Sequence, residues 1–123
     1  MKPAMFHLSV SSGNLTAQEL QTLKQYVVEA VCREFGLDPA LLATTGNAHE
    51  IVWCRHVCTY VLRTQTRLNT RRIASIWGQD HSSVTYAMGK VRDVMAVYPT
   101  DRAKVEKLCA ELFHSGDKET QQP

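Results

Sequence analysis

The sequence predicts a small all-α domain of about six helices that contains a helix-turn-helix motif. Three observations predict it. Apolar residues recur at helical spacing along most of the chain, helix-capping residues stand between these stretches, and a glycine turn joins two of them within residues 71–97. The chain has 123 residues, 44% of them hydrophobic, which is enough to bury one core without disulfides or metal.

The first half of the chain is predicted to hold three helices. Thr16–Glu19 has the pattern of a capping box, and the helix that follows it ends at Gly36. A short helix then begins with Asp38 as its cap and Pro39 at its first helical position. A longer helix is expected from about 50 to 67. The residues it is predicted to turn inward are Val52 or Trp53, His56, Val57, Tyr60 and Val61.

The helix-turn-helix is predicted in the second half. Asn69 can cap a short helix that must stop at Gly78, because the residue after a helix often takes the left-handed conformation that suits glycine. The second helix has apolar residues at helical spacing, namely Val84, Ala87, Met88, Val91 and Met95. In this motif the first residues of the second helix reach base edges. Here they are Asp80, His81, Ser82 and Ser83, although Asp and Ser are also favoured at any helix start.

A last helix and two loose ends complete the expected organisation. Residues 99–101, Pro-Thr-Asp, break the chain before a helix whose apolar positions are Val105, Leu108, Leu112 and Phe113. We expect a flexible segment at 1–14, one helical domain at 15–113, and a flexible tail at 114–123.

Basic residues are concentrated in one part of the chain. The net charge is +2 for the whole chain. Residues 1–52 hold three basic and five acidic residues (−2), and residues 93–123 hold four basic and six acidic ones (−2). Between them, at 53–92, seven basic residues face Asp80 alone (+6), namely Arg55, Arg63, Arg67, Arg71, Arg72, Lys90 and Arg92. Such a concentration is the footprint expected of phosphate contacts.

A string of motif residues carries a family resemblance. In order, the chain has Arg55-His56, then Thr66, then a short helix at 73–78 ending in Trp-Gly, then Gln-Asp-His-Ser-Ser-Val at 79–84. This order resembles the C-terminal DNA-binding domain of DnaA, the bacterial chromosomal replication initiator. There, Arg-His or Arg-Gln leads to a Thr, then to Phe-Gly, then to Arg-Asp-His-Thr-Thr-Val. The resemblance is strongest over 55–91 and extends more weakly to about 26 and 113.

The resemblance implies a Trp-repressor-like fold of the DnaA C-terminal type. It also implies binding of double-stranded DNA in replication initiation, in its regulation, or in transcription, at the nucleoid in the bacterial cytoplasm. The base-reading residues carried over are Asp80, His81, Ser82 and Ser83. The residues expected to contact the DNA backbone are Arg63, Thr70, Arg71, Arg72, Lys90 and Arg92.

Two departures from the family pattern matter. Ser82 and Ser83 replace family threonines, which keeps the hydroxyl but loses a methyl group that can pack on thymine. The family also has an arginine-rich loop from which one arginine enters the minor groove. The corresponding segment 44–50 has no Arg or Lys, so weaker and less A·T-sensitive binding is expected.

Other chemistries are less favoured by the sequence. Cys54 and Cys58, with His49 and His56, form at most one close ligand pair, whereas zinc sites usually show two. A Cys-His nucleophilic pair is rare on core-facing helices. Gly89-Lys90 lacks the earlier glycine of a nucleotide-binding loop. We therefore expect no catalysis, no cofactor and no metal, and cysteines that stay reduced.

The expected partners are double-stranded DNA and other replication or regulatory proteins, with no membrane and no small-molecule substrate. No stretch approaches the roughly eighteen apolar residues of a membrane span, and no signal peptide is evident.

One alternative function stays open, a protein-interaction module that kept the fold but lost specific DNA reading. An exposed apolar patch over the helix from residue 50, or over the last helix, would favour it. DNA binding would be favoured if one face gathers Arg63, Arg71, Arg72, Lys90 and His81.

Overall fold

The computed structural model describes residues 15–43 and 48–113. Within these residues the chain forms five α-helices and one 3-10 helix, with no strand. In chain order they are α2 (Ala17–Phe35), η1 (Pro39–Ala43), α3 (His49–Gln65), α4 (Thr70–Trp77), α5 (His81–Val97) and α6 (Pro99–Phe113). The predicted all-α fold of about six helices is confirmed.

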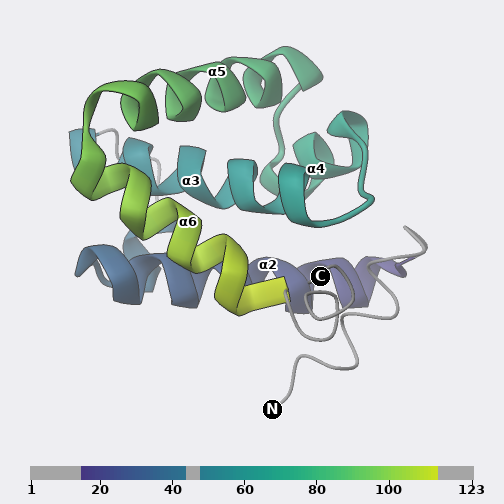
Figure 1. Cartoon of the computed structure of the whole chain (residues 1–123). Coiled ribbons are helices and arrows are strands. Elements are labelled where there is room, and N and C mark those ends of the chain that lie inside the picture. The colour runs from purple at the N-terminus through teal and green to yellow at the C-terminus, as the bar shows by residue number, and fades with distance from the viewer. Residues whose placement is uncertain (1–14, 44–47, 114–123) are drawn as a thin grey trace, which may run out of the picture.

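The helix α3 lies at the centre of the fold. It packs against α2, α4, α5, α6 and η1, and Figure 1 shows it between α5 above and α2 below, with α6 crossing in front. Its apolar side contributes to one continuous core, in which the largest fully buried side chains include Leu23, Val27, Val57, Val61, Leu62, Leu68, Ile73, Val84, Val91 and Val105. Since α4 and α5 both rest on α3, this core fixes the orientation of the helix-turn-helix.

The helix ends in the first half follow the predicted capping. The Thr16 hydroxyl accepts from the Glu19 N–H at 3.1 Å, and the Glu19 carboxylate accepts from the Thr16 N–H at 2.9 Å. Gly36 ends α2 in the left-handed conformation with φ 72°. The Asp38 carboxylate accepts from the Ala40 N–H at 3.0 Å, and the short element it starts is a 3-10 helix.

The end of α3 differs from the prediction. The helix stops at Gln65 rather than near residue 67, because Thr66 takes an extended conformation. The Thr66 hydroxyl donates to the Leu62 carbonyl and accepts from the Leu68 N–H, so it replaces the helical bonds at this end. This turn places Leu68 in the core and leaves Asn69 free to start α4.

The inward face of α3 is only partly as predicted. Val57 and Val61 are fully buried, whereas Trp53, His56 and Tyr60 are half-buried at its margin. The other buried residues of α3 are Cys54, Cys58, Thr59 and Leu62. The buried face of α3 is therefore rotated about the helix axis from the predicted one, so that it includes Cys54 and Cys58.

The cysteines are free thiols inside or beside the core. Cys32, Cys54 and Cys58 are at most 1% exposed, and Cys109 is half-buried. Burial, with the neighbouring Cys32 and Glu50, raises the pKa of Cys54 to about 12, and burial raises the pKa of Cys58 as well. Thiols with raised pKa values are poor nucleophiles and poor metal ligands. Among the described residues, His, Cys, Asp and Glu nowhere gather in a group of three or more that could hold a metal ion.

Several expectations fall on residues that the structure does not describe. The predicted flexible segments 1–14 and 114–123, and the loop residues 44–47 that replace the family's arginines, lie outside the described residues. Of the helices that are described, none is both long enough and apolar enough to cross a membrane.

Candidate nucleic-acid interface

The turn between α4 and α5 is held by glycine geometry and backbone bonds. Gly78 has φ 66° and ends α4. The Gly78 N–H donates to the Ser75 carbonyl at 3.3 Å, and the Gln79 N–H donates to the Ala74 carbonyl at 2.9 Å. A residue in the left-handed region followed by such bonds is a common helix end, and it sets the direction in which the next helix leaves.

Asp80 caps α5 and binds both serines that follow it. Its Oδ1 accepts from the Ser83 N–H at 3.1 Å, from the Ser82 hydroxyl at 2.8 Å and from the Ser83 hydroxyl at 3.2 Å. These bonds, with that from Ser82 the largest contribution, lower the pKa of the Asp80 carboxyl. The predicted cap is confirmed. The start of α5 therefore presents an ionised carboxylate and two hydroxyl groups whose protons already point to it.

The helix α5 has two different edges. Its buried residues are Val84, Ala87, Met88 and Val91. Since residues of an α-helix advance by roughly 100° each, His81, Thr85 and Arg92 lie along one border of this buried face. Ser83 and Lys90 lie along the opposite border. The structure places different neighbours beside each edge.

Basic side chains from three helices meet at the first edge. Two adjoining hollows, of about 380 and 530 Å³, open there and share Arg63, Thr70 and Thr85. Arg71 and His81 line one of them, and Arg92 lines the other. We call this surface the basic face and define it by Arg63, Thr70, Arg71, His81 and Arg92. It holds half of the residues that the sequence predicted to bind DNA.

Two of the other predicted residues lie elsewhere. The Arg72 guanidinium donates to the Leu15 carbonyl at 2.7 Å and is half-buried, so it ties α4 to the residues before α2. Lys90 is exposed on the opposite edge of α5, near His56 and Tyr86. The predicted cations therefore do not form one cluster.

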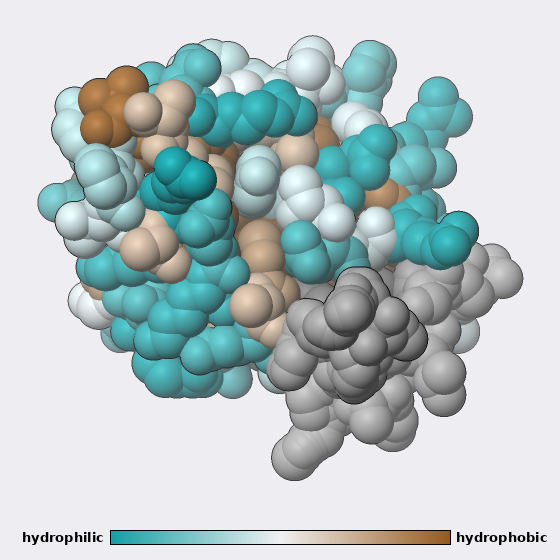
Figure 2. Space-filling model, in the orientation of Figure 1, coloured by the Kyte–Doolittle hydropathy of each residue, from teal (hydrophilic) through white to brown (hydrophobic). Residues whose placement is uncertain are grey.

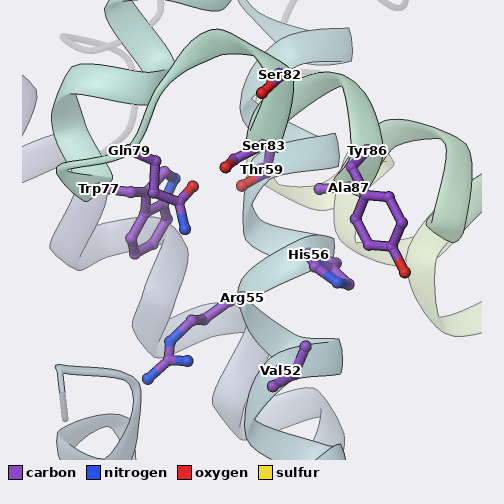
Figure 3. A pocket seen from close by; sticks show the side chains of 10 residues that line it. All are labelled: Val52, Arg55, His56, Thr59, Trp77, Gln79, Ser82, Ser83, Tyr86 and Ala87. Carbon is purple, nitrogen blue, oxygen red and sulfur yellow. The ribbon is translucent and has the colours of Figure 1, made fainter. Parts of the chain in front are cut away.

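Ser82 and Ser83 line a polar hollow of about 310 Å³ between α3 and α5. Figure 3 shows Gln79 beside the Trp77 ring on one side of this hollow, with Thr59 near Ser83 and with Arg55 and His56 on α3. Within the described part of the chain, the Trp77 Nε1–H is buried without a hydrogen-bond partner. Both Trp53 and Trp77 are half-buried and pack against the core.

Sequence reasoning missed two residues at the interface. Thr85 follows His81 by four residues and precedes Arg92 by seven, so helical spacing alone could have placed it on the same edge. Gln79, in the turn, points its side chain over the polar hollow. Nothing in the sequence separates it from an ordinary turn residue.

Known proteins resemble the chain over this region. The family described as "Bacterial dnaA protein helix-turn-helix" matches residues 25–91. The chain is 32% identical over 97 residues to the chromosomal replication initiator protein DnaA of Deinococcus radiodurans. The matching segment covers 79% of this chain and 21% of the relative. The chain is also 32% identical over 78 residues to DnaA of Thermus thermophilus, covering 63% of this chain and 18% of the relative. The chain thus spans about a fifth of the length of these relatives.

Proposed function

Because the chain belongs to the bacterial DnaA helix-turn-helix family, we propose that it binds double-stranded DNA sequence-specifically through α4 and α5. Its biological role would be in replication initiation or in the regulation of that process, at the bacterial nucleoid. The proposed activity is binding rather than catalysis, and other replication proteins are its expected protein partners.

The basic face is the observation that carries this proposal. Arg63, Arg71 and Arg92 come from three different helices. Arg63 and Arg71 lie beside His81 at the start of α5, and Arg92 lies further along the same edge, in the second hollow that Arg63 also lines. None of the described residues that line its two hollows is acidic. A set of cations without counter-charges attracts the phosphates of duplex DNA and releases condensed ions when they bind.

In the proposed complex α5 enters the major groove with its N-terminal end. An α-helix with its side chains is roughly 10–12 Å across, and the major groove is about 12 Å wide. His81, Ser82 and Ser83 then approach base edges, while the other residues of the basic face, Arg63, Thr70, Arg71 and Arg92, lie against the phosphates of one strand. Arg63 contributes to both hollows of the basic face and is expected to make the central phosphate contact.

The capping bonds predict which base edges suit this helix. Ser82 and Ser83 donate their hydroxyl protons to Asp80, so the groups that they turn toward DNA are oxygen lone pairs. Lone pairs accept from the amino groups of adenine and cytosine in the major groove. We therefore expect the selected site to place adenine or cytosine opposite the start of α5.

A salt series tests the proposal. If about five phosphates are contacted, the slope of log K against log salt concentration should lie near −4 to −5. The slope is measured by titrating one duplex at several salt concentrations, after the site has been selected from a random duplex pool. A slope near zero, or no binding even at low salt, would contradict DNA binding.

A second candidate function is supported by a different observation. Tyr86, Val97 and Tyr98 are exposed on α5 or directly after it, as a protein-interaction module would require. Of the five residues whose gathering would favour DNA binding, Arg63, Arg71 and His81 share the basic face, whereas Arg72 and Lys90 lie elsewhere. DNA binding therefore remains the better-supported function, and the apolar surface needs its own explanation.

A further inference from the structure

Among the described residues, large hydrophobic side chains are exposed mainly along one side of α5 and directly after it. Tyr86 is 62% exposed, Val97 64% and Tyr98 56%, and the remaining exposed one, Leu41, lies on η1. Figure 2 shows a small group of strongly hydrophobic atoms near the junction of α5 and α6. Exposed large apolar side chains can mark an interaction site.

A groove of about 580 Å³ runs beside these residues. Its lining comes from α3, α5, the residue between α5 and α6, and α6, and consists of His49, Val52, Trp53, His56, Tyr86, Lys90, Val94, Tyr98 and Asp101. We call it the aromatic groove. Its rings are held in place by their neighbours. His56 and Tyr86 meet edge to face with centroids 5.7 Å apart, and Trp53 meets Phe35 at 6.1 Å.

The aromatic groove continues into the polar hollow. The two share Val52, His56 and Tyr86, so one open surface follows α3 and α5 from Gln79 to Asp101. Figure 3 shows Val52 and His56 on successive turns of α3 below Tyr86. An elongated groove between two helices suits an extended or helical peptide better than a compact ligand.

Positive charge converges on the middle of this surface. Lys90 lines the aromatic groove, and Arg55 lines the adjoining polar hollow, where its Nε also donates to the Leu42 carbonyl at 3.3 Å. Burial, then the charges of Lys90 and Arg55, lower the pKa of His56, which lines both. Asp101 is the acidic residue of the described lining, and it lies at the far end on α6. An anionic group is therefore favoured near His56, and an apolar group is favoured nearer Tyr98.

We propose that the aromatic groove binds an acidic, apolar peptide segment of a partner protein. An apolar side chain of that segment packs between Trp53, Tyr86 and Tyr98, and its carboxylates lie toward Lys90 and Arg55. Aromatic residues in such a groove are typical binding hot spots. The aromatic groove lies on the edge of α5 opposite the basic face, although it continues into the polar hollow that Ser82 and Ser83 line. Peptide binding is measured on the free chain without DNA, so its presence or absence is established separately from the duplex titrations.

The experiment uses three fluorescein-labelled peptides with the same leucines and phenylalanines. One carries Asp and Glu, the second carries Asn and Gln at the same positions, and the third carries Lys and Arg. Fluorescence anisotropy with the whole chain should give about tenfold tighter binding for the acidic peptide than for the neutral one, the size expected of two favourable ion pairs. The basic peptide should bind weakest. Equal binding of the acidic and neutral peptides would overturn the proposal.

Neighbouring residues supply matched variants. Tyr98→Ser should weaken binding of the acidic peptide about tenfold. Val97→Ser, at a residue of similar exposure that lies outside the groove lining, should change this affinity less than about twofold. Lys90→Gln should reduce the difference between the acidic and neutral peptides. Circular dichroism verifies that the variants remain helical.

Three further results would overturn the proposal. The first is equal loss of peptide binding in Tyr98→Ser and Val97→Ser. The second is self-association of the wild-type chain in sedimentation that Tyr98→Ser abolishes, which would assign the groove to a second copy. The third is duplex binding that Tyr98→Ser weakens more than Val97→Ser, which would assign it to nucleic acid.

Discussion

The two edges of α5 carry different chemistry on the same helix. Along one, His81 and Arg92 face Arg63 across shallow hollows without acidic neighbours among the described lining. Along the other, Lys90 borders half-buried rings such as Trp53. Because side chains on opposite borders of a helix point away from each other, one helix can serve a phosphate-binding surface and an apolar surface. Basic residues that are close together in the sequence therefore fall on opposite edges of α5, and the edge on which each one lies decides whether it can join the proposed phosphate-binding surface.

The largest expected effect on duplex affinity comes from removing one cation from each edge of α5 and comparing the losses. Arg63→Ala should weaken the selected duplex and random duplex alike, by about tenfold or more, since a charged hydrogen bond contributes about 1.5–3 kcal/mol. It should also make the salt slope shallower by about one unit. Lys90→Ala should lose less affinity, because Lys90 lies outside the basic face. Titrations of both duplexes across a salt series measure these losses. An equal or larger loss for Lys90→Ala would show that the edge beside the aromatic groove carries the main phosphate contact.

Base reading should separate from phosphate binding at the start of α5. His81→Ala and Ser83→Ala should each reduce the difference in binding free energy between selected and random duplex by about 1–3 kcal/mol, the value of a good base contact. The ratio of the two affinities falls accordingly. Ser75→Ala is the control, because the Ser75 hydroxyl donates to the Arg72 carbonyl within α4 and away from the proposed contacts. If the ratio survives His81→Ala but collapses in Arg63→Ala, the recognition surface has been assigned to the wrong residues.

The fold was predictable because its signals are local. Capping by Thr16 and Asp80, glycine at 36 and 78, and apolar spacing gave the helices and their order. The exceptions were both in α3. Its buried face includes Cys54 and Cys58 rather than His56 and Tyr60, and at its end the Thr66 hydroxyl competes with the helix for backbone groups. Serine and threonine can end a helix in this way or remain inside it, and sequence alone does not decide between the two.

The candidate site was predictable in part. The members of the basic face were expected from the motif and from the concentration of basic residues, although they come from three helices. The positions of His81, Ser82 and Ser83 follow from the motif. Arg72 could not be placed, because its guanidinium binds the carbonyl of Leu15, far away in the sequence. The aromatic groove was also out of reach, since it depends on how α3, α5 and α6 pack together.

The two left-handed glycines allow stability to be separated from DNA binding. Gly78 and Gly36 have φ of 66° and 72°, and a Cβ at either would meet no atom within 4 Å. Gly78→Ala and Gly36→Ala should therefore cost similar stability, about 1–2 kcal/mol each, from the backbone alone. Thermal unfolding measures this cost. Only Gly78→Ala should also weaken duplex binding, because Gly78 directs α5. Equal loss of DNA binding in both variants would mean that the loss comes from general destabilisation.

The smallest expected effect concerns the protons at the start of α5. Hydrogen bonds from Ser82 and then Ser83 lower the pKa of Asp80, so its capping is fully present above the pKa of an unfolded aspartate and is lost as pH falls through the lower folded value. Carboxyl NMR titration should place the Asp80 pKa below the ordinary range of aspartate. Ser82→Ala should raise it, and Ser75→Ala should leave it unchanged. If Asp80 titrates at its ordinary value in the wild-type chain, the serine hydroxyls do not donate to it. Their lone pairs are then not fixed toward DNA, and the expected preference for adenine or cytosine loses its physical basis.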